Sequence, residues 1–294
     1  MKILLLGKGG QVGWELQRAL APLGELIAHD FDTADFTRPD AVAALAREVR
    51  ADVIVNAAAH TAVDKAESEP DLVRLINATT PAALAAVAAE QGSWLVHYST
   101  DYVFDGSGHT ARTEDAPVAP LSVYGQTKLE GEQAIAASGC QHLIFRTSWV
   151  YGARGGNFAK TMLKLAAERE ALKVINDQVG APTGADLLAD ITAHAVRAAR
   201  QRPELSGLYH LVAGGETTWF DYARFVIEWA RARGVAVKVA PEAIAPVPTT
   251  EYPTPAKRPL NSRLNTHKLQ TAFGLRLPQW QAGVERMLTE HLGV

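Results

Sequence analysis

The sequence predicts an α/β fold in which a doubly wound parallel sheet is followed by a smaller, mixed C-terminal region. The first observation is that short apolar runs alternate with longer helical patterns through the first half of the chain. These runs lack period-two alternation, as expected for parallel strands buried on both faces. The second observation is a glycine-rich turn between the first run and the first helix. Because strands that alternate with helices are joined by right-handed crossovers, a parallel sheet follows.

The expected elements follow from these patterns in chain order. We expect strands at residues 2–6, 25–29, 52–56, 94–98, 142–147 and 207–211. We expect helices at residues 11–21, 39–50, 72–91, 127–137, 157–168, 185–200 and 219–233. Six of the fifteen prolines fall within residues 241–259. Because proline has no N–H donor, this segment is predicted to be an extended, ordered loop.

Composition excludes several classes of protein. Lys and Arg number 29 and Asp and Glu 32, so the net charge is −3 and no basic excess supports nucleic-acid binding. The single cysteine, Cys140, excludes an internal disulfide and fits a reducing compartment. The N-terminal apolar run ends at Leu6, too early for a secretory signal. No run approaches the roughly 18 apolar residues of a membrane span. We therefore expect a cytoplasmic protein that binds neither nucleic acid nor membrane.

The glycine-rich turn predicts a dinucleotide site. Gly7, Gly10 and Gly13 follow the first strand and open the first helix. In this pattern the glycines allow a tight turn, the approach of a pyrophosphate and close helix packing, respectively. Asp30, at the end of the second strand, stands where a carboxylate binds an adenosine ribose. A generic turn and a solvated acid are the alternatives, and Lys8 leaves the choice between NADH and NADPH open.

The length predicts about two domains. We expect residues 1–150 to form a Rossmann-like dinucleotide-binding domain and residues 151–294 to form mainly a substrate domain. The family resemblance described below implies that some later segments return to the first sheet.

Tyr124 and Lys128 stand four residues apart, the spacing of one helix face. A neighbouring ammonium lowers the pKa of a phenol, and such a tyrosine can exchange a proton with a carbonyl or an alcohol. Thr100 follows the fourth strand, at the edge where ligands of doubly wound sheets bind, and is placed to hold a substrate oxygen. An isolated Tyr-x-x-x-Lys is also typical of an ordinary surface aromatic–cation pair.

In this order and spacing, the glycine turn, the strand-end Thr and the Tyr-x-x-x-Lys pair resemble the extended short-chain dehydrogenase/reductase superfamily. Longer strings at residues 55–67, 146–151, 176–184 and 258–262 resemble the dTDP-4-dehydrorhamnose reductase family, essentially from end to end of the chain. The resemblance implies that NADPH or NADH reduces the C4 ketone of dTDP-4-dehydro-L-rhamnose. The product, dTDP-L-rhamnose, is a precursor of bacterial surface polysaccharide such as O-antigen.

The resemblance also implies residue roles. Tyr124 is the proton donor, and Lys128 tunes it and binds the cofactor ribose. Thr100 replaces the serine that is usual in the superfamily, and it contacts substrate together with Asp101 and Trp149. The implied cofactor contacts are Gly7, Gly10, Gln11, Val12, Gly13, Asp30, Asp35, Phe36, Ala59, His60, Thr61, Tyr98, Tyr124 and Lys128. The alternatives are a packed core aromatic for Trp149 and a satisfied loop histidine for His60.

Two differences from related enzymes narrow the chemistry. Sugar-nucleotide 4,6-dehydratases follow the strand-end Thr with Asp and then Glu, whereas here Asp101 precedes Tyr102, so elimination of water is disfavoured. Related epimerase–reductases use a Cys/His pair, but Cys140 lies away from the matched strings. A plain ketoreductase remains. A non-catalytic regulatory subunit and a reductase or epimerase for another nucleotide sugar stay open as alternatives.

Some members of the reductase family are magnesium-linked homodimers held by three carboxylates. The matching positions are Glu15, Asp186 and Glu290. The family pattern has glutamate at position 186, and the shorter Asp puts that ligand in doubt. Three solvated surface acids are the alternative.

Overall fold

The computed structural model describes residues 1–293 as a six-stranded, entirely parallel sheet with helices on both faces. The strand order is β10-β5-β4-β3-β1-β2, so the chain reverses direction across the sheet between β1 and β3. Ligands of such sheets bind at the carboxyl ends of the strands beside this reversal. The strands are β1 Lys2–Leu6, β2 Glu25–His29, β3 Val53–Asn56, β4 Trp94–Thr100, β5 Gln141–Thr147 and β10 Gly207–His210. The doubly wound, Rossmann-like fold class is confirmed.

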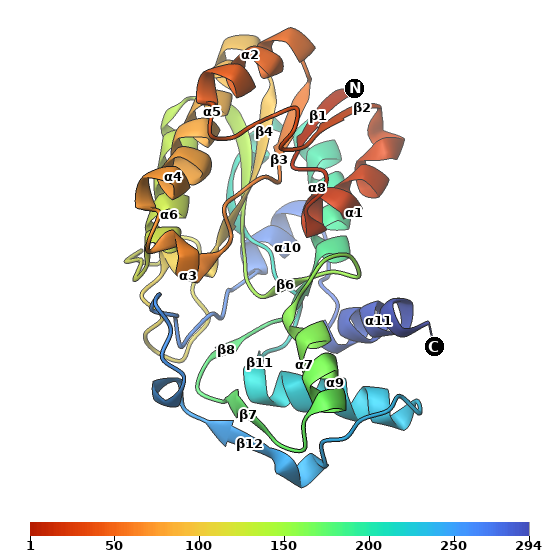
Figure 1. Ribbon diagram of the computed structural model, residues 1–294. Coiled ribbons are helices and arrows are strands. Elements are labelled where there is room, and N and C mark those ends of the chain that lie inside the picture. The colour runs from red at the N-terminus through yellow and green to blue at the C-terminus, as the bar shows by residue number, and fades with distance from the viewer. Residues whose placement is uncertain (294) are drawn as a thin grey trace.

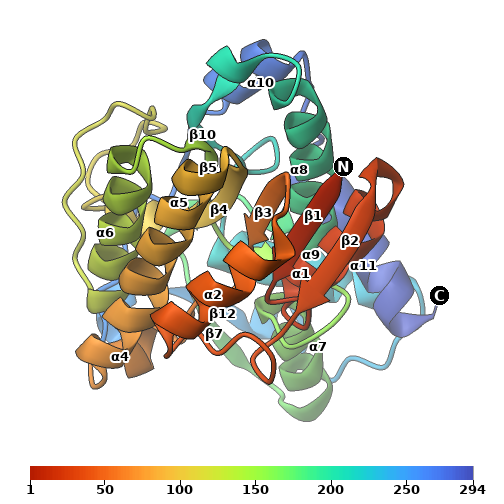
Figure 2. The same ribbon diagram turned by 90° about the horizontal axis from the view of Figure 1, so that it is seen from above.

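Helices cover the two faces of the sheet in separate layers (Figure 2). On one face lie α1 Gln11–Leu20 and α8 Ala185–Ala199, packed on Leu5, Val55 and Val96. On the other face lie α2 Pro39–Val49, α5 Thr80–Gln91 and α6 Val123–Ala137. Because successive strand side chains point to opposite faces, both cores are apolar and the strands read as continuous apolar runs.

The second half of the chain forms a smaller layer below the carboxyl edge of the sheet (Figure 1). Its helices are α7 Phe158–Glu168, α9 Trp219–Ala232 and α11 Trp280–Leu292, whereas α10 His267–Phe273 packs against β10 and α8 of the main sheet. Its short strand pairs are β6 Val150–Tyr151 with β9 Thr183–Gly184, β7 Leu172–Ile175 with β12 Ile244–Val247, and β8 Val179–Gly180 with β11 Thr217–Thr218. However, β10 and α8, also from the second half, belong to the layers of the main sheet. A domain boundary near residue 150 therefore stays a prediction.

Several element boundaries differ from expectation in ways that matter for the site. Strand β4 runs on to Thr100. Helix α6 begins at Val123, because the Ser122 hydroxyl accepts a hydrogen bond from the Gly125 N–H and caps it. The predicted helix 127–137 started too late, and Tyr124 is helical. The proline-rich segment contains β12, with Pro246 in it, as well as the short 3₁₀ turns Pro241–Ala243 and Thr249–Glu251. Pro246 is tolerated because β12 belongs to a sheet of only two strands.

The helix predicted at residues 72–91 begins at residue 70, and it is not α-helical along its whole length. It consists of α4 Pro70–Arg74, a π-helical turn Leu75–Thr79 and α5. Over its 22 residues it is long and apolar enough to cross a membrane, which contradicts our expectation that the chain has no such run. In this fold half of its most apolar window is buried, and α5 packs against α2 and α6.

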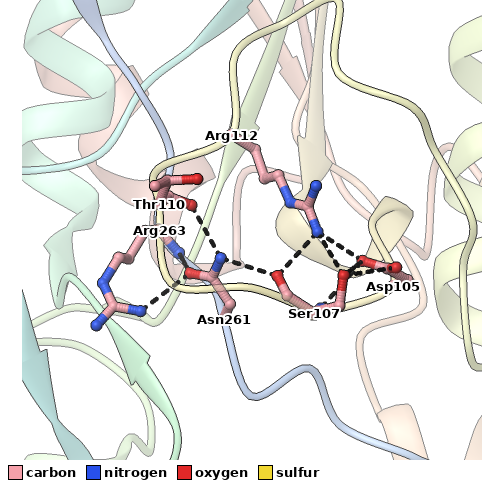
Figure 3. Close-up of polar contacts among 6 residues, drawn as sticks. All are labelled: Asp105, Ser107, Thr110, Arg112, Asn261 and Arg263. Atoms are coloured by element: carbon pink, nitrogen blue, oxygen red, sulfur yellow. Dashed lines mark hydrogen bonds and ion pairs between the residues drawn. The ribbon is translucent and has the colours of Figure 1, made fainter.

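Residues 258–265, which we call the C-terminal strap, tie the second half to the loop that follows β4 (Figure 3). The Asn261 side-chain amide donates hydrogen bonds to the Ser107 carbonyl at 3.2 Å and the Thr110 carbonyl at 2.9 Å. Its backbone N–H donates to the Gly106 carbonyl at 3.0 Å. The Arg112 N–H donates to the Arg263 carbonyl at 2.9 Å. Asn261 is only 2% exposed, so its polar atoms depend on these partners.

We expect Asn261→Ala to lower the free energy of unfolding by about 1–3 kcal/mol, because a buried side chain that bonds two loop carbonyls is removed. Urea unfolding followed by circular dichroism measures the change. The matched control is Asn265→Ala in the same strap, whose side-chain oxygen accepts one exposed bond from the His267 N–H. Equal losses in the two variants would contradict the proposed role of Asn261.

Candidate active site

The turn after β1 packs directly against the backbone of the segment that follows β3. Gly7 has a φ of +83°, and a Cβ on it would lie 2.7 Å from the Ala58 nitrogen. A Cβ on Gly13 would lie 1.9 Å from the Gly7 oxygen, so α1 packs directly on the turn. By contrast, Gly10 faces open space, with no atom closer than 3.5 Å to such a Cβ. Because α1 has no side-chain N-cap, its first N–H groups are free for an anion.

A hollow beside this turn has the lining that an adenosine requires. Asp30 is at one end, and its carboxylate lies so near Gly9 that a Cβ there would meet Oδ2 at 2.1 Å. Phe36 lines the apolar part of the hollow. Asp35 does not line it; its carboxylate accepts two hydrogen bonds from Thr37, which hold its pKa below the ordinary value. The remaining lining residues are Gly7, Gly10, Phe31, Ala34, Thr37, Ala57, Ala58, Ala59 and Ile76.

The segment after β3 is held by the π-helical turn. The Asn77 side chain accepts a hydrogen bond from the His60 N–H at 2.9 Å and donates to the His60 carbonyl at 3.1 Å. Ala59 and Thr61 thereby face the cavity beside Gly10, whereas His60 is not part of the lining. π-Helical turns are rare and concentrate at functional sites, and this one places Asn77 under the loop. No motif in the sequence marks Asn77 as part of the site.

The three predicted catalytic residues meet in one cavity of about 440 Å³. Thr100 comes from the end of β4, and Tyr124 and Lys128 come from the first two turns of α6. The cavity shares Gly10, Ala57 and Ala59 with the adenosine hollow, so the two form one continuous groove. Other predicted contacts that line it are Gln11, Val12, Thr61, Tyr98, Asp101 and Trp149.

Thr100 and Asp101 form a buried hydrogen-bonded pair in this cavity. The Thr100 hydroxyl donates to Asp101 Oδ1 at 3.0 Å and accepts from the Tyr102 N–H at 3.2 Å. Burial raises the pKa of Asp101 to about 6, and the nearby hydroxyls of Ser262 and Thr100 act against that rise. Ser262 belongs to the C-terminal strap, so this carboxylate is the point at which the strap meets the catalytic residues.

The protonation states differ from those expected from the sequence. Burial raises the pKa of Tyr124 to about 12, and the nearby Asp101 adds to the rise while a hydrogen bond with Thr100 opposes it. Burial lowers the pKa of Lys128 to about 8, although Glu132 acts against this. Our expectation that Lys128 lowers the pKa of Tyr124 is therefore wrong for the protein without ligands. The reason is that both groups are desolvated, which favours the neutral form of each.

Strand β4 provides the polar contacts of the Lys128 amine. Its Nζ donates to the Tyr98 carbonyl at 2.6 Å and lies 3.0 Å from His97 Nε2. The Tyr98 hydroxyl points the other way and bonds the Thr192 hydroxyl at 2.6 Å. The contact of Tyr98 with cofactor stays a prediction, and its hydroxyl is already engaged by Thr192. No motif in the sequence marks His97, although it stands three residues before Thr100 on the same strand.

Trp149 lines the same cavity and occupies an unusual backbone position. Its φ is +49°, in the left-handed region that non-glycine residues rarely adopt. The indole stacks on Trp219 with ring centres 3.7 Å apart, and Trp219 Nε1 donates to the Gln178 side chain at 3.0 Å. Trp149 therefore lines the cavity, as a substrate contact would, and it is also packed against another aromatic ring, as the alternative interpretation expects.

The predicted metal ligands lie around a separate hollow on the other side of α1. Glu15, Asp186 and Glu290 all line it. Arg18 pairs with Glu15 at 3.4 Å, and Arg286 lies 3.6 Å from Asp186. Within residues 1–293, no group of three or more His, Cys, Asp or Glu side chains is placed to hold a metal ion. One chain alone therefore does not offer a formed magnesium site here.

Comparison with known proteins agrees with this geometry. Residues 1–292 match the family described as RmlD substrate binding domain. A relative named dTDP-4-dehydrorhamnose reductase, from Shigella flexneri, is 62% identical over 294 residues, covering 99% of this chain and 98% of the relative. The crystal structure of a dTDP-4-dehydrorhamnose reductase from Clostridium acetobutylicum has a TM-score of 0.90 at 39% identity, with all of both chains covered. A dTDP-4-dehydrorhamnose reductase from Bacillus anthracis, in complex with NADP, has a TM-score of 0.89 at 34% identity, covering 98% of this chain and 99% of the other. The chain belongs to the RmlD substrate binding domain family.

Proposed function

We propose that this protein reduces the C4 ketone of dTDP-4-dehydro-L-rhamnose with NADPH or NADH, giving dTDP-L-rhamnose. The observation that carries the proposal is the meeting of Thr100, Tyr124 and Lys128 in a cavity continuous with the glycine turn. The relatives named above support the substrate, and the NADP complex of one of them supports the cofactor.

The residues present fit a bound dinucleotide. The free N–H groups at the start of α1 suit a pyrophosphate, and Asp30 suits a ribose hydroxyl. The adjoining apolar surface of Phe36 and Ile76 suits an adenine ring. When bound, the reduced nicotinamide supplies the hydride. Lys128, at the inner end of the groove, would hold the adjacent ribose.

Tyr124 is suited to donate a proton in the reducing direction. Because its pKa is raised to about 12, its phenol is protonated at neutral pH and can pass that proton to an oxygen that is becoming negatively charged. Thr100 is held by Asp101 and the Tyr102 N–H, so its hydroxyl is already oriented beside Tyr124. Trp149 would bound the sugar from the opposite wall.

The structure also bears on the alternative functions. Epimerisation through a cysteine would need a reactive thiol at the site, but Cys140 is buried in the core beneath α5, and burial raises its pKa. Elimination would need a second acid after Asp101, and Tyr102 stands there, with its ring 5.5 Å from that of Tyr124. A purely regulatory subunit would have no need for the buried amine and hydroxyls of this cavity. We further propose a cytoplasmic location, which the free thiol of Cys140 supports.

Tyr124→Phe should reduce ketone-dependent turnover by about 10²–10⁴-fold while leaving the dissociation constant for NADPH nearly unchanged, because only the proton donor is removed. Stopped assays of dTDP-4-dehydro-L-rhamnose and fluorescence titration of NADPH measure the two effects. The control is Tyr222→Phe, which removes another buried hydroxyl, one without a hydrogen-bond partner in the second-half core. Turnover near that of the wild type in Tyr124→Phe would contradict the assigned role.

Asp30→Asn should raise the ratio of kcat/KM for NADPH to that for NADH by about tenfold, because the 2′-phosphate no longer meets a like charge. The substitution keeps the shape that fits against Gly9. Steady-state kinetics with both cofactors at one ketone concentration give the ratio. Asp32→Asn, two residues away and exposed, is the control. A ratio that is unchanged in Asp30→Asn would show that Asp30 does not contact the ribose.

The carboxylates Glu15, Asp186 and Glu290 of one chain are not placed to hold a magnesium ion within the described residues. No catalytic step proposed here depends on a metal-linked dimer. Glu15 pairs with Arg18 and Asp186 pairs with Arg286, which favours ordinary surface acids at these two positions. We expect EDTA to leave both turnover and the mass measured by light scattering unchanged. A fall in mass on chelation, reversed by added magnesium, would instead establish the metal-linked homodimer.

A further inference from the structure

Phe31 is a large apolar side chain that stands in water at the rim of the adenosine hollow. It is 67% exposed, the highest value among the large apolar residues of the described chain. It belongs to none of the apolar clusters that form the cores of residues 1–293. Single exposed apolar residues are common on soluble proteins, so exposure alone assigns no role. Phe31, however, lines the hollow next to Asp30.

The turn that carries Phe31 is fixed by hydrogen bonds. It follows β2 directly, and the N–H groups of Thr33 and Ala34 both donate to the Asp30 carbonyl, at 2.9 and 2.8 Å. The Thr33 hydroxyl lies 3.0 Å from Nδ1 of His29, the last residue of β2. The backbone of Phe31 is thus held on both sides while its ring stays exposed. An exposed ring on an ordered turn needs little reordering when a ligand covers it.

The rest of the hollow is apolar apart from Asp30 and Thr37. Its volume is about 240 Å³. Phe36 is 5% exposed and packs in the core with residues of α2 and α5, so it forms a fixed inner wall. Ile76 adds an aliphatic surface from the π-helical turn. Such a lining suits an apolar ring that carries a polar group at the Asp30 end.

An adenosine has both of these parts. The proposed contact of Asp30 with the ribose leaves the base, which is attached to the same ribose, beside the apolar lining. Aromatic side chains stack on the π-face of a base, and this attraction does not depend on a net charge. Phe36 has little surface left to cover, whereas most of Phe31 is in water. Covering Phe31 would therefore also remove apolar surface from water.

Charged groups around the turn do not supply this affinity. Residues 30–40 carry four acids, at positions 30, 32, 35 and 40, and one cation, Arg38. Lys8, the cation within the glycine-rich turn, does not line the hollow. A dinucleotide is itself an anion, so the charge of this segment opposes its approach. An uncharged contact is therefore the source of affinity that this end of the groove can offer.

We propose that Phe31 stacks on the adenine ring of NADPH or NADH and supplies affinity that is the same for both cofactors. Asp30 responds to the charge of a 2′-phosphate, whereas an aromatic ring does not. The proposal rests on the dinucleotide site proposed above. Its tests measure binding to the full-length protein without ketone, so they can fail while the proposed reduction stands, and they can succeed if the ketone is not the substrate.

The first test is the loss of affinity in Phe31→Ala. Removal of an aromatic ring that stacks on a base weakens binding by about tenfold, so the Kd for ADP-ribose, NADH and NADPH should each rise by about that factor. Phe31→Tyr keeps the ring and should bind each ligand within about twofold of the wild type. Isothermal titration calorimetry at neutral pH measures all three ligands. An unchanged Kd in Phe31→Ala, or an equal loss in Phe31→Tyr, contradicts the proposal.

Two comparisons separate stacking from other causes. Tyr252→Ala removes another exposed aromatic residue, 57% exposed in the second half of the chain, and should leave every Kd unchanged. In Phe31→Ala the ratio of the Kd for NADPH to that for NADH should stay within about twofold of the wild-type ratio, since stacking does not sense the 2′-phosphate. A loss confined to NADPH would assign Phe31 to the phosphate rather than to the base, and would overturn the proposal.

The contact itself can be observed by NMR. In protein labelled with ¹³C in its phenylalanine rings and saturated with ADP-ribose, we expect nuclear Overhauser effects between the adenine protons and the ring protons of Phe31. The signals of Phe31 are those that disappear in Phe31→Leu. A lower affinity in Phe31→Ala without this contact would show that the residue only shapes the turn, and would contradict the proposal.

Discussion

The catalytic arrangement depends on an amine that is almost completely removed from water. Lys128 is 2% exposed, and a charged amine at such a depth is costly unless other groups satisfy it. Its partners come from strand β4: the Tyr98 carbonyl and the His97 ring. Glu132, the nearest acid on the same helix, is occupied by Arg146. Burial therefore lowers the pKa of the amine and raises that of the neighbouring phenol, the two shifts that suit a proton donor for a ketone.

Three local features bring the rest of the site to this amine. The Ser122 cap starts α6 one residue before Tyr124, which puts the phenol and the amine on successive turns. The π-helical turn places Asn77 against the backbone at His60, which fixes the loop after β3. The C-terminal strap brings Ser262 to Asp101 beside Thr100. Groups from both halves of the chain are thus needed to complete a cavity whose base is the main sheet.

Much of this could be predicted from local sequence, because it depends on short-range constraints. The alternation of apolar runs and helices gave the sheet, and the Tyr-x-x-x-Lys spacing placed Tyr124 and Lys128 together. The remaining features depend on contacts distant in sequence. His97 and Asn56 are 41 residues apart, and only the register of β3 with β4 makes them partners. The direction of the Tyr124 pKa shift could not be predicted, because it is set by burial, which depends on the tertiary fold. The π-helical turn could not be predicted, because its residues have the composition of an ordinary α-helix.

In the proposed reaction the hydride is delivered to C4 of the nucleotide sugar within the cavity lined by Thr100, Tyr124 and Lys128. The most direct test is to supply enzymatically prepared dTDP-4-dehydro-L-rhamnose with NADPH or NADH deuterated at the nicotinamide C4, and to examine the product by NMR. We expect one deuterium at C4 of dTDP-L-rhamnose for each cofactor oxidised. Absence of ketone-dependent cofactor oxidation, or deuterium at another carbon, would contradict it.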